Sequence, residues 1–451
     1  MSSSNFSRRK FLSGAATVGA ASAMGIGAFT SCSGGGEKAG ISGIYDFKSR
    51  ELNLPPMLDI APDGPELKAG VIGCGGRGSG AALNFISAGP NLTVTALGDV
   101  FKDRVDDCRA KIKKEHNIEV PEENCFVGFD AFEKVIDAGV DVIILATPPK
   151  FRPEHFEAAV KARKHVFMEK PIAVDPVGIR QIIAAAKMAE SLGLKIVTGT
   201  QRRHEHSYVN LWKEINKNAI GHIVSANVYW NQSKLWHRDK NASWSEMEWM
   251  IRDWVNWCWL SGDHIVEQHV HNIDVASWFI GGHPVKAVGF GSRQRRVTGD
   301  QYDNFSIDYF YEDGRHIHSM CRQINGCANG VYEIFHGTKA IAITDGHKPK
   351  IVDAAGNELF VAQGSETSRY VQEHINLVTC IRQNIPFNEA EQTAISNMVA
   401  IMGRVSAYTG KEVTYDEMMN SDLKLGPDVY VMGDIGYIQN AKVPVPGDAA
   451  E

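Results

Sequence analysis

The feature that most constrains this chain is a glycine-rich turn that follows a short apolar segment. Leu67–Ile72 has the composition of a buried strand. It runs directly into Gly73, Gly75 and Gly78, which are spaced as G-x-G-x-x-G, and residues 79–87 have helical character. In such a turn the first glycine permits the tight bend and the second lets backbone amides approach a pyrophosphate. The third allows the helix to pack closely on the strand. The turn therefore predicts a nucleotide-binding βαβ unit.

An acidic residue follows at the spacing that a dinucleotide site requires. A second expected strand, residues 92–97, ends at Gly98-Asp99, about 20 residues after the last glycine of the turn. There a carboxylate can accept hydrogen bonds from the adenosine ribose. Asp99 favours NAD because it would repel the 2′-phosphate of NADP, but Lys102 and Arg104 nearby leave NADP as an alternative. The predicted cofactor is NAD.

The order of the expected helices and strands changes near residue 200. Before that point, strand-like runs at residues 141–146 and 165–168 alternate with helix-like runs at 105–116, 153–163 and 177–192. Such alternation predicts a doubly wound parallel sheet. Several short strand-like runs then follow between residues 285 and 360, and two long helices are expected at 370–383 and 389–408. We therefore expect an α/β protein with an N-terminal Rossmann sheet and a C-terminal α+β domain built on an open, mostly antiparallel sheet.

Further motifs complete a family pattern. Ala146-Thr147-Pro148-Pro149 ends one strand, His155 stands in the next helix, and Glu169-Lys170-Pro171 ends a later strand. With the glycine turn, these motifs resemble the Gfo/Idh/MocA family of oxidoreductases, over residues 67–427. The resemblance implies that Lys170 lies beside the nicotinamide and the reacting hydroxyl, and the C-terminal end of a parallel strand is also the ligand-binding edge of such a sheet. The expected cofactor-binding residues are Gly73, Gly75, Arg77, Gly78, Asp99, Thr147, Pro148, His155, Glu169 and Lys170.

A second motif is expected to supply the proton-transfer partner. Residues 261–274 resemble the family segment G-G-x-x-x-D-x-x-x-H-x-x-D, with Glu267 where aspartate is usual and with His271 and Asp274 matched. If the segment is one helix, these three side chains share a face. Two carboxylates would then control the tautomer and the pKa of His271. We expect Lys170, His271 and Glu267 to be catalytic.

A metal site in the same segment is disfavoured. His264, His269 and His271 are close in sequence, but His269 would point away from His271 on a helix. No metal is predicted.

The segment that follows the first sheet is expected to contact the substrate. The resemblance implies that it crosses above the nicotinamide, so Arg203 and Tyr208 are expected there, together with Asp274 and Trp254. Seven of the nine tryptophans lie between residues 230 and 259, among charged residues. Aromatic faces with polar neighbours can grip a sugar ring. An ordinary aromatic core or a dimer interface is the equal alternative.

The N-terminus has the pattern of an export signal. Ser7-Arg8-Arg9-Lys10 precedes a mildly apolar run to Thr30, which resembles a twin-arginine signal, and Cys32 follows in a context resembling a lipobox. We expect a periplasmic protein whose one membrane contact would be a lipid anchor on Cys32. The predicted divisions are the signal (1–31), a flexible tether (32–64), the Rossmann domain (65–200), the substrate and oligomerisation domain (201–425) and a C-terminal tail (426–451).

Composition and resemblance together indicate a function. The net charge of −6 without a basic block argues against nucleic-acid binding, and the sequence contains no strongly apolar run of the length that spans a bilayer. We predict an NAD(P)-dependent oxidoreductase that acts on a secondary hydroxyl or keto group of a sugar, glycoside or polyol, with tightly bound cofactor. The resemblance implies a homo-oligomer, a dimer or tetramer. Two alternatives remain at this stage: an NAD-dependent glycoside hydrolase that transiently oxidises C3, and a non-catalytic sugar-binding lipoprotein.

Overall fold

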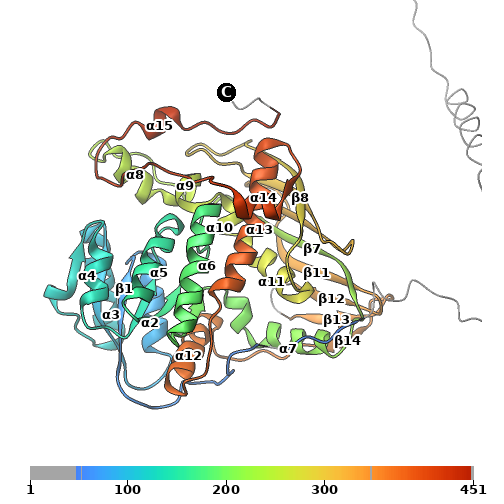
Figure 1. Cartoon of the computed structure of the whole chain (residues 1–451), viewed down its shortest axis with the longest axis horizontal. Coiled ribbons are helices and arrows are strands. Elements are labelled where there is room, and N and C mark those ends of the chain that lie inside the picture. Colours follow the sequence, from blue (N-terminus) through green and yellow to red (C-terminus); the bar gives the residue numbers. More distant parts are fainter. Residues whose placement is uncertain (1–46, 52, 346–347, 448–451) are drawn as a thin grey trace, which may run out of the picture. The chain divides into compact units, whose positions relative to one another are not determined.

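The computed structural model describes residues 47–447, apart from 52 and 346–347 (Figure 1). The predicted signal and Cys32 lie outside the described residues. The first sheet is parallel and has the strand order β3-β2-β1-β4-β5-β6. Its strands are β1 (Leu67–Ile72), β2 (Leu92–Asp99), β3 (Cys125–Val127), β4 (Val142–Leu145), β5 (His165–Met168) and β6 (Ile196–Thr198). The helices between them are α2 (Gly76–Ile86), α3 (Lys102–His116), α4 (Ala131–Asp137), α5 (Arg152–Lys161) and α6 (Pro176–Ser191). This order confirms the predicted Rossmann fold.

The second sheet has the order β14-β13-β12-β11-β7-β10-β9-β8-β15. Only the pairing of β7 with β10 is parallel, so the expectation of a mostly antiparallel sheet is confirmed. The strands are β7 (Ile223–Gln232), β8 (Lys286–Ser292), β9 (Asn304–Phe310), β10 (His316–Gln323), β11 (Gly330–Gly337), β12 (Ile341–Thr344), β13 (Lys350–Val352), β14 (Glu358–Val361) and β15 (Val413–Thr414). The helices that accompany this sheet are α7 (His206–Asn216), α8 (Glu246–Arg252), α9 (Cys258–Ser261), α10 (His264–Glu267), α11 (Val270–Ile280), α13 (Ala390–Thr409), α14 (Tyr415–Asn420) and α15 (Tyr437–Asn440). In the part of the chain that the structure describes, no helix is long and apolar enough to cross a membrane.

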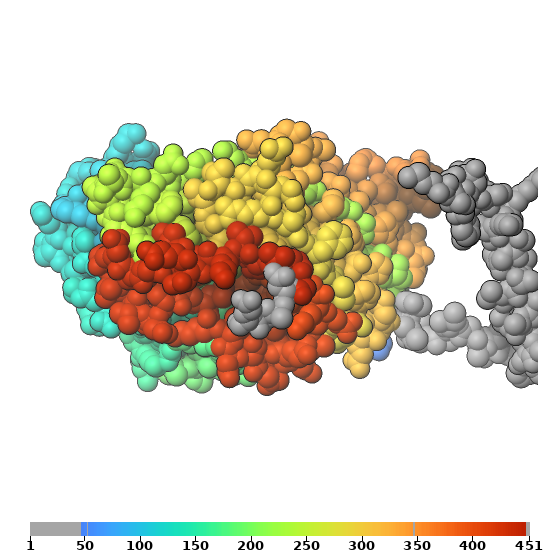
Figure 2. All heavy atoms as spheres, turned by 90° about the horizontal axis from the view of Figure 1, so that it is seen from above, coloured from blue at the N-terminus to red at the C-terminus, as the bar shows by residue number. Residues whose placement is uncertain are grey.

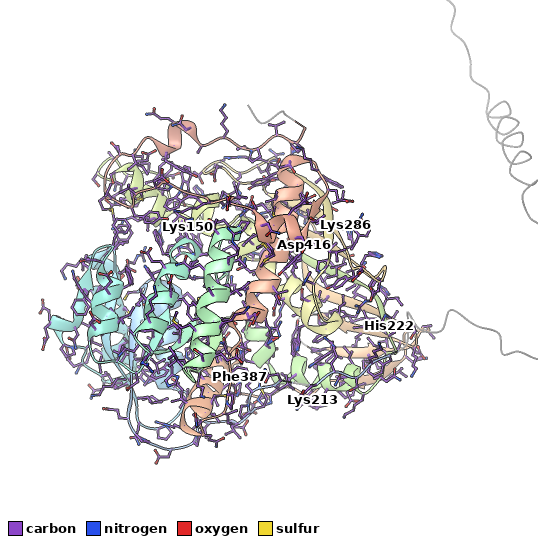
Figure 3. All side chains as sticks on the ribbon, in the orientation of Figure 1. Lys150, Lys213, His222, Lys286, Phe387 and Asp416 are labelled. Atoms are coloured by element: carbon purple, nitrogen blue, oxygen red, sulfur yellow. The ribbon has the colours of Figure 1, made fainter. Side chains whose placement is uncertain are left out.

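One late helix returns to the first sheet. Helix α12 (Arg369–Arg382) packs against α2 and β6, and its Leu377 and Val378 belong to the same hydrophobic core as strand residues of β1 and β4. Phe387, labelled in Figure 3, lies in this core as well. Residues from the end of the chain therefore complete one face of the nucleotide-binding sheet.

The expected tether is not free over its described part. The guanidinium of Arg50 donates to the carbonyl oxygens of Trp278, at 3.0 Å, and Phe279, and it lies over the ring of Trp212 at 4.2 Å. Ala61 is buried, and its amide donates to the carbonyl of Ala88 at 2.8 Å. The prediction of a flexible tether is therefore wrong for these residues, because their backbone and side-chain contacts fix them to the folded domain.

The C-terminal segment is also held in place. The carboxylate of Glu246 in α8 is buried and accepts hydrogen bonds from the backbone amides of Ile435, Gly436 and Ile438 at 2.5–2.7 Å. The hydroxyl of Tyr302 donates to the carbonyl of Pro444 at 2.8 Å. Figure 2 shows this segment, in red, lying along the surface beside the part of the chain coloured yellow-green to yellow. The described C-terminal residues, 425–447, therefore form a strap that is hydrogen-bonded to α8.

Candidate active site

The glycine turn has the close packing that its spacing predicts. Gly73 has φ +92°, and a Cβ there would lie 2.5 Å from the amide nitrogen of Thr147. A Cβ on Gly78 would lie 1.8 Å from the carbonyl oxygen of Gly73. Gly75 is different, because a Cβ there would meet no atom within 4 Å. Two of the glycines are therefore required for packing, and the third keeps a space open at the start of α2.

That open space belongs to a cavity of about 430 Å³. Gly75 and Gly76 line it where α2 begins, and backbone amides at a helix N-terminus bind phosphate groups. Asp99 lines it at the end of β2, as do Thr147, Pro148 and His155 beyond β4. Six of the ten expected cofactor residues thus line one cavity at the C-terminal ends of the strands, which fits NAD, whereas Gly78 and Lys170 are not among the lining residues.

Asp99 is held by the backbone around it. Its carboxylate accepts hydrogen bonds from the amides of Cys74, at 2.7 Å, and Phe101, at 3.0 Å. Burial raises the pKa of Asp99 to about 6, against these hydrogen bonds and the nearby charge of Arg104, which lower it. Each carboxylate oxygen still has a lone pair for a ribose hydroxyl.

His155 is a neutral, packed member of the cavity wall. Its ring stacks on Phe132 at 4.1 Å, and its Nδ1 lies 3.5 Å from the hydroxyl of Thr147. Burial, and next the charge of Arg152, lowers the pKa of His155 to about 3. It therefore offers the cofactor a flat, uncharged surface.

Two expected cofactor residues pair with each other instead. Arg77 forms an ion pair with Glu169 and a second with Glu373 of α12, at 3.2 Å. Neither Arg77 nor Glu169 lines the nucleotide cavity. The expectation of direct cofactor contact is not supported by this geometry, because the partly exposed Arg77 and the buried Glu169 neutralise each other. Sequence reasoning missed Glu373, which lies far along the chain from both partners.

Lys170 and Glu267 meet across the two parts of the molecule. The Lys170–Pro171 peptide bond is cis. The Lys170 ammonium donates to the backbone carbonyl of Glu267 at 2.5 Å and to its carboxylate at 3.0 Å. Lys170 follows β5 of the first sheet, whereas Glu267 ends α10. Two residues that were expected to be catalytic therefore pair directly, although Glu267 was expected to hold His271 and not Lys170.

The side chain of His271 is buried. It is 6% exposed, its ring stacks on Trp230 at 5.6 Å, and its Nε2 lies 3.4 Å from the amide nitrogen of Gln201. Burial, and next the positive charge of Lys170, holds the pKa of His271 well below its ordinary value. Since the side-chain nitrogen of Gln201 can only donate a hydrogen bond, this contact favours the His271 tautomer with an unprotonated Nε2. Gln201 is a contact that no sequence motif indicated.

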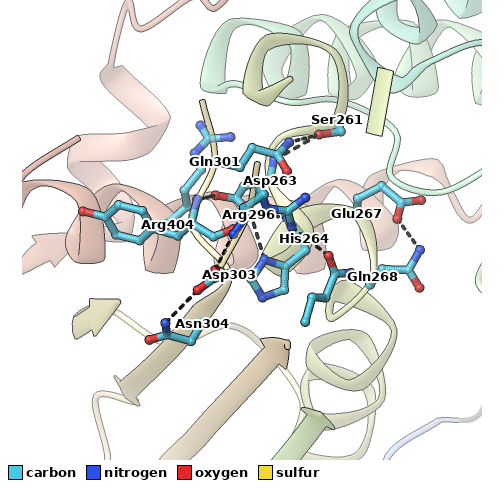
Figure 4. Close-up of polar contacts among 12 residues, drawn as sticks. Ser261, Asp263, His264, Glu267, Gln268, Arg296, Gln301, Asp303, Asn304 and Arg404 are labelled. Atoms are coloured by element: carbon cyan, nitrogen blue, oxygen red, sulfur yellow. Dashed lines mark hydrogen bonds and ion pairs between the residues drawn. The ribbon is translucent and has the colours of Figure 1, made fainter. Parts of the chain in front are cut away.

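The expected single helix is broken between Glu267 and His271. Helix α10 ends at Glu267 and α11 begins at Val270. The Glu267 carboxylate consequently contacts Lys170 and Gln268, as Figure 4 shows for the second of these. The prediction that two carboxylates hold His271 is wrong, because the break turns the first carboxylate toward the lysine.

Asp274 is occupied elsewhere. Arg203 donates to both of its carboxylate oxygens at 2.8 Å, and Ser396 donates to one at 2.8 Å. Tyr208 is likewise buried, with its hydroxyl 3.2 Å from a carboxylate oxygen of Glu333. All three residues were expected to contact the substrate, but Arg203 is only 5% exposed, Asp274 2% and Tyr208 1%. They hold together the elements behind the site, because each polar group already has a buried partner.

The start of α10 is fixed by Asp263. This residue has φ +70°, and its carboxylate accepts from the His264 amide at 2.5 Å, the Tyr302 amide at 2.9 Å and the Tyr408 hydroxyl at 2.5 Å. Figure 4 shows Asp263 beside His264. Asp263 therefore anchors the start of α10 to the second sheet. His269 points into that sheet, with its Nε2 2.7 Å from the Ser319 hydroxyl of β10, whereas His271 stacks on Trp230 of the neighbouring β7.

The tryptophans divide into two groups. Trp257 and Trp259 are 3% and 0% exposed within an aromatic core, which confirms the core alternative for those two. Trp236 and Trp254 line the nucleotide cavity and contact each other at 6.3 Å. Trp254 therefore lies on the cofactor side of the molecule.

The strap contributes to the same cavity. Tyr430 lines it and stacks on Trp259 at 6.1 Å and against Phe151 at 5.1 Å. Leu425 donates its amide at 2.9 Å to Asp175, which also binds the ammonium of Lys150 at 2.8 Å. Asp175 therefore connects the nucleotide domain to the strap, and Lys150, labelled in Figure 3, neutralises its carboxylate. The cavity thus has a wall of tryptophans and tyrosine that comes from outside the first sheet.

Comparison with protein families agrees with the architecture. A family model described as an oxidoreductase family with an NAD-binding Rossmann fold matches residues 67–196. The C-terminal domain model of the same family matches residues 208–343. The chain belongs to the Gfo/Idh/MocA family. The prediction of the family, and of NAD as the nucleotide of its Rossmann domain, is confirmed.

Individual relatives of this Gfo/Idh/MocA protein are distant. It is 24% identical over 237 residues to a scyllo-inositol 2-dehydrogenase (NAD(+)) from Bacillus subtilis, which is 52% of this chain and 60% of the relative. It is 24% identical over 259 residues to a glycosyl hydrolase family 109 protein from Streptomyces coelicolor, or 53% of this chain and 52% of that protein. The matched region thus spans less than two thirds of these curated relatives.

Solved structures share the fold over most of the chain. An aldose-aldose oxidoreductase from Caulobacter crescentus superposes with a TM-score of 0.63 at 17% identity, covering 77% of this chain and 99% of that one. An apo scyllo-inositol dehydrogenase from Lactobacillus casei gives 0.59 at 19% identity, covering 78% and 99%. At these identities the likeness concerns the fold alone.

Proposed function

We propose that this protein is an NAD-dependent oxidoreductase that acts on a secondary hydroxyl of a sugar, glycoside or polyol. The observation that carries the proposal is the meeting of Lys170, at the end of a Rossmann strand, with Glu267 of the second part of the chain. The charge of the same Lys170 contributes to the lowered pKa of the buried His271. Relatives named as inositol dehydrogenases support this substrate class.

The lysine would stabilise the developing alkoxide. An ammonium group has three N–H donors, and Glu267 receives two of them in the structure. The third is free to donate to a substrate hydroxyl oxygen. Because Lys170 and Glu267 are largely buried, this charged hydrogen bond is stronger than it would be in water.

The histidine would receive the hydroxyl proton. Its lowered pKa keeps Nε2 able to accept, and Gln201 holds the ring through that atom until a substrate arrives. Because burial and the positive charge of Lys170 disfavour an imidazolium, His271 would pass the proton on rather than keep it. The bound nicotinamide would accept the hydride from the same carbon.

We also propose that the cofactor is retained between turnovers. Trp236 and Trp254 line one side of the nucleotide cavity and Tyr430 of the strap lines it too. Because Glu246 fixes the strap by three backbone hydrogen bonds, release of the nucleotide requires this wall to move.

The proposal is tested with the purified protein as isolated. Mass spectrometry after denaturation should recover NAD(H), and a panel of sugars and polyols should change the absorbance of the bound nicotinamide. Lys170→Met serves as the control, since it should keep the nucleotide and lose the response to sugar. A protein that contains no nucleotide after gentle purification would refute retention. A loaded protein that responds to no sugar or polyol would refute the substrate class.

A redox-neutral glycoside hydrolase is the second candidate. It is favoured by the similarity to the glycosyl hydrolase family 109 protein, which covers 53% of this chain. Product analysis separates the two reactions: accumulation of a keto sugar supports the dehydrogenase. Release of a reducing sugar with no net change in NADH supports the hydrolase.

We further propose export by the twin-arginine route. The Arg8-Arg9 pair and the apolar run after it support this location, although both lie outside the described residues. Replacing both arginines with lysine should leave the protein in the cytoplasmic fraction, whereas unchanged periplasmic recovery would refute the route.

A further inference from the structure

A second cavity lies beside the nucleotide cavity and has a different chemistry. Its volume is about 320 Å³, within the range of small-molecule pockets. The segment between β7 and α8 separates the two: Trp236 and Arg238 line the nucleotide cavity, whereas Leu235 and His237 line the second one. The second cavity is lined by Lys234, Leu235, His237, Asn256, Arg295, Arg296, Val297, Thr298, Gln323, Ile324 and Asn325.

The hydrogen-bond acceptors of this cavity are already used. The side-chain oxygens of Asn256 and Gln323 each accept from the Arg296 guanidinium at 2.7 Å. The side-chain oxygen of Asn325 accepts from the backbone amide of Lys234 at 3.0 Å. Since a guanidinium can only donate, these contacts fix which end of the Asn256 and Gln323 amides is the oxygen. The wall therefore presents donors.

One of those donors is buried and has no protein partner. Gln323 is 3% exposed, and its amide nitrogen makes no hydrogen bond with any described residue. The same holds for the buried hydroxyl of Thr298. Buried polar groups are nearly always paired, so an unpaired donor in a cavity wall indicates a group that binds there.

Two positive charges are uncommitted. The Lys234 ammonium and the Arg295 guanidinium make no hydrogen bond or ion pair with the rest of the described chain, in contrast to Arg296. No acidic side chain is among the described residues that line the cavity. The nearest acids are engaged: Asp303 accepts from the backbone amides of Arg295 and Arg296, and Asp239 lies 3.6 Å from His237. In a chain with a net charge of −6, this is a local reversal of sign.

We propose that this cavity binds a sugar unit that carries an oxyanion, either a carboxylate or a sulfate ester. Lys234 and Arg295 would pair with the oxyanion, and the Gln323 amide would donate to it or to a neighbouring ring hydroxyl. The volume exceeds that of a bare ion, which is why the anion is assigned to a sugar.

One wall of the cavity is close in sequence to the residue that packs on His271, and we assign both to the same substrate. Trp230, which stacks on His271, precedes Lys234 by four residues, so their Cα atoms are within about 14 Å of each other. A di- or oligosaccharide can cover that span. This assignment rests on the proposed function, and it narrows the substrate class to acidic glycans or their conjugates.

Direct binding tests the assignment without turnover. Glucuronate, glucose 6-sulfate, glucose and inorganic sulfate would be titrated calorimetrically into the full protein as isolated. We expect at least one of the two acidic sugars to bind about 10-fold or more tightly than glucose, with an affinity that falls as salt is added. The tighter of the two acidic sugars identifies the source of the oxyanion.

The matched variants are Lys234→Ala with Arg295→Ala, and Lys339→Ala with Lys442→Ala. Both pairs remove two exposed cations, but the second pair lies outside the cavity. The first pair should weaken acidic-sugar binding about 10-fold or more while leaving the nucleotide content unchanged, and the second pair should change neither. Gln323→Leu should weaken binding as well, and Gln323→Glu should weaken it further by repulsion.

Three results would overturn the assignment. These are equal affinity for glucose and both acidic sugars, equal affinity of the wild type and the first pair, and binding of inorganic sulfate as tightly as the acidic sugars. Failure of the proposed function is distinguishable, because a protein that oxidises no sugar but still binds an acidic sugar in this pattern retains the site.

Discussion

The cleanest test of the nucleotide site is an alanine at Gly75. A Cβ at this position would meet no protein atom within 4 Å, and the backbone, at φ −63° and ψ −172°, is accessible to alanine. Loss of the favourable glycine N-cap costs about 0.5–1 kcal/mol. Reduced freedom of the unfolded chain offsets this by about 0.4–1 kcal/mol. The free energy of unfolding of nucleotide-free Gly75→Ala should therefore differ from wild type by less than about 1 kcal/mol.

Nucleotide affinity should respond differently. The added methyl group would occupy the space through which backbone amides of the turn reach a pyrophosphate. Losing one hydrogen bond to a charged phosphate costs about 1.5–3 kcal/mol. The affinity for NADH should therefore fall about 10- to 150-fold. Calorimetric titration of NADH into stripped protein measures the affinity, and urea unfolding of the same preparation measures stability.

The companion variant Gly78→Ala should instead lower the stability of the nucleotide-free protein. Its Cβ would lie 1.8 Å from the carbonyl oxygen of Gly73, so α2 must move away from β1. Such overpacking costs about 1–3 kcal/mol or more of stability before any nucleotide is added. If Gly75→Ala binds NADH within two-fold of wild type, the cavity beside the turn is not the pyrophosphate site and the reasoning is refuted.

Three further perturbations address the chemistry, the pH dependence and the strap. Lys170→Met and His271→Ala should each lower turnover about 10²–10⁴-fold with bound nucleotide retained. A larger loss of turnover in His269→Ala than in His271→Ala would contradict this, because it would make His269 the proton acceptor. The pKa of Asp99 is raised to about 6 by burial, so below that pH the folded apo-protein holds a proton that must leave before the carboxylate can bind the ribose. Affinity for NADH should therefore fall as the pH is lowered through about 6, and Asp99→Asn should bind more weakly with that step absent; a step of the same size in Asp99→Asn would assign it to another group. Tyr430→Ala removes an aromatic side chain from the cavity wall and should speed NADH release, measured by stopped-flow displacement, several-fold or more; an unchanged rate would remove the strap from cofactor retention.

The sequence alone was sufficient for most of the first sheet and for the glycine turn. The turn could be predicted because its requirements are local: Gly73 needs a positive φ and Gly78 needs the absence of a Cβ within one βα unit. Buried parallel strands are short continuous apolar runs, so most of them were placed within one or two residues. The short β3 and α4 were not predicted, because neither is long enough to show a period.

The sequence also indicated which residues carry the chemistry, but the tertiary structure decided what they touch. Lys170 and Glu267 are far apart in the chain, and only the tertiary structure, in which α10 packs on α13, brings the ammonium to the carboxylate. Arg77 is neutralised by Glu169 and by Glu373 of α12, a helix that returns to the sheet late in the chain.

The same distinction explains the expectations that were wrong. A helical pattern predicted one face for Glu267, His271 and Asp274, but Asp263 anchors α10 to the second sheet and the helix breaks before Val270. The described part of the tether and the strap have the polar, glycine- and proline-rich composition of free chain. The side chain of Arg50, in the tether, donates to the backbone carbonyl of Trp278, and the side chain of Glu246 accepts from backbone amides of the strap. Such contacts between distant segments produce no periodic pattern in a sequence.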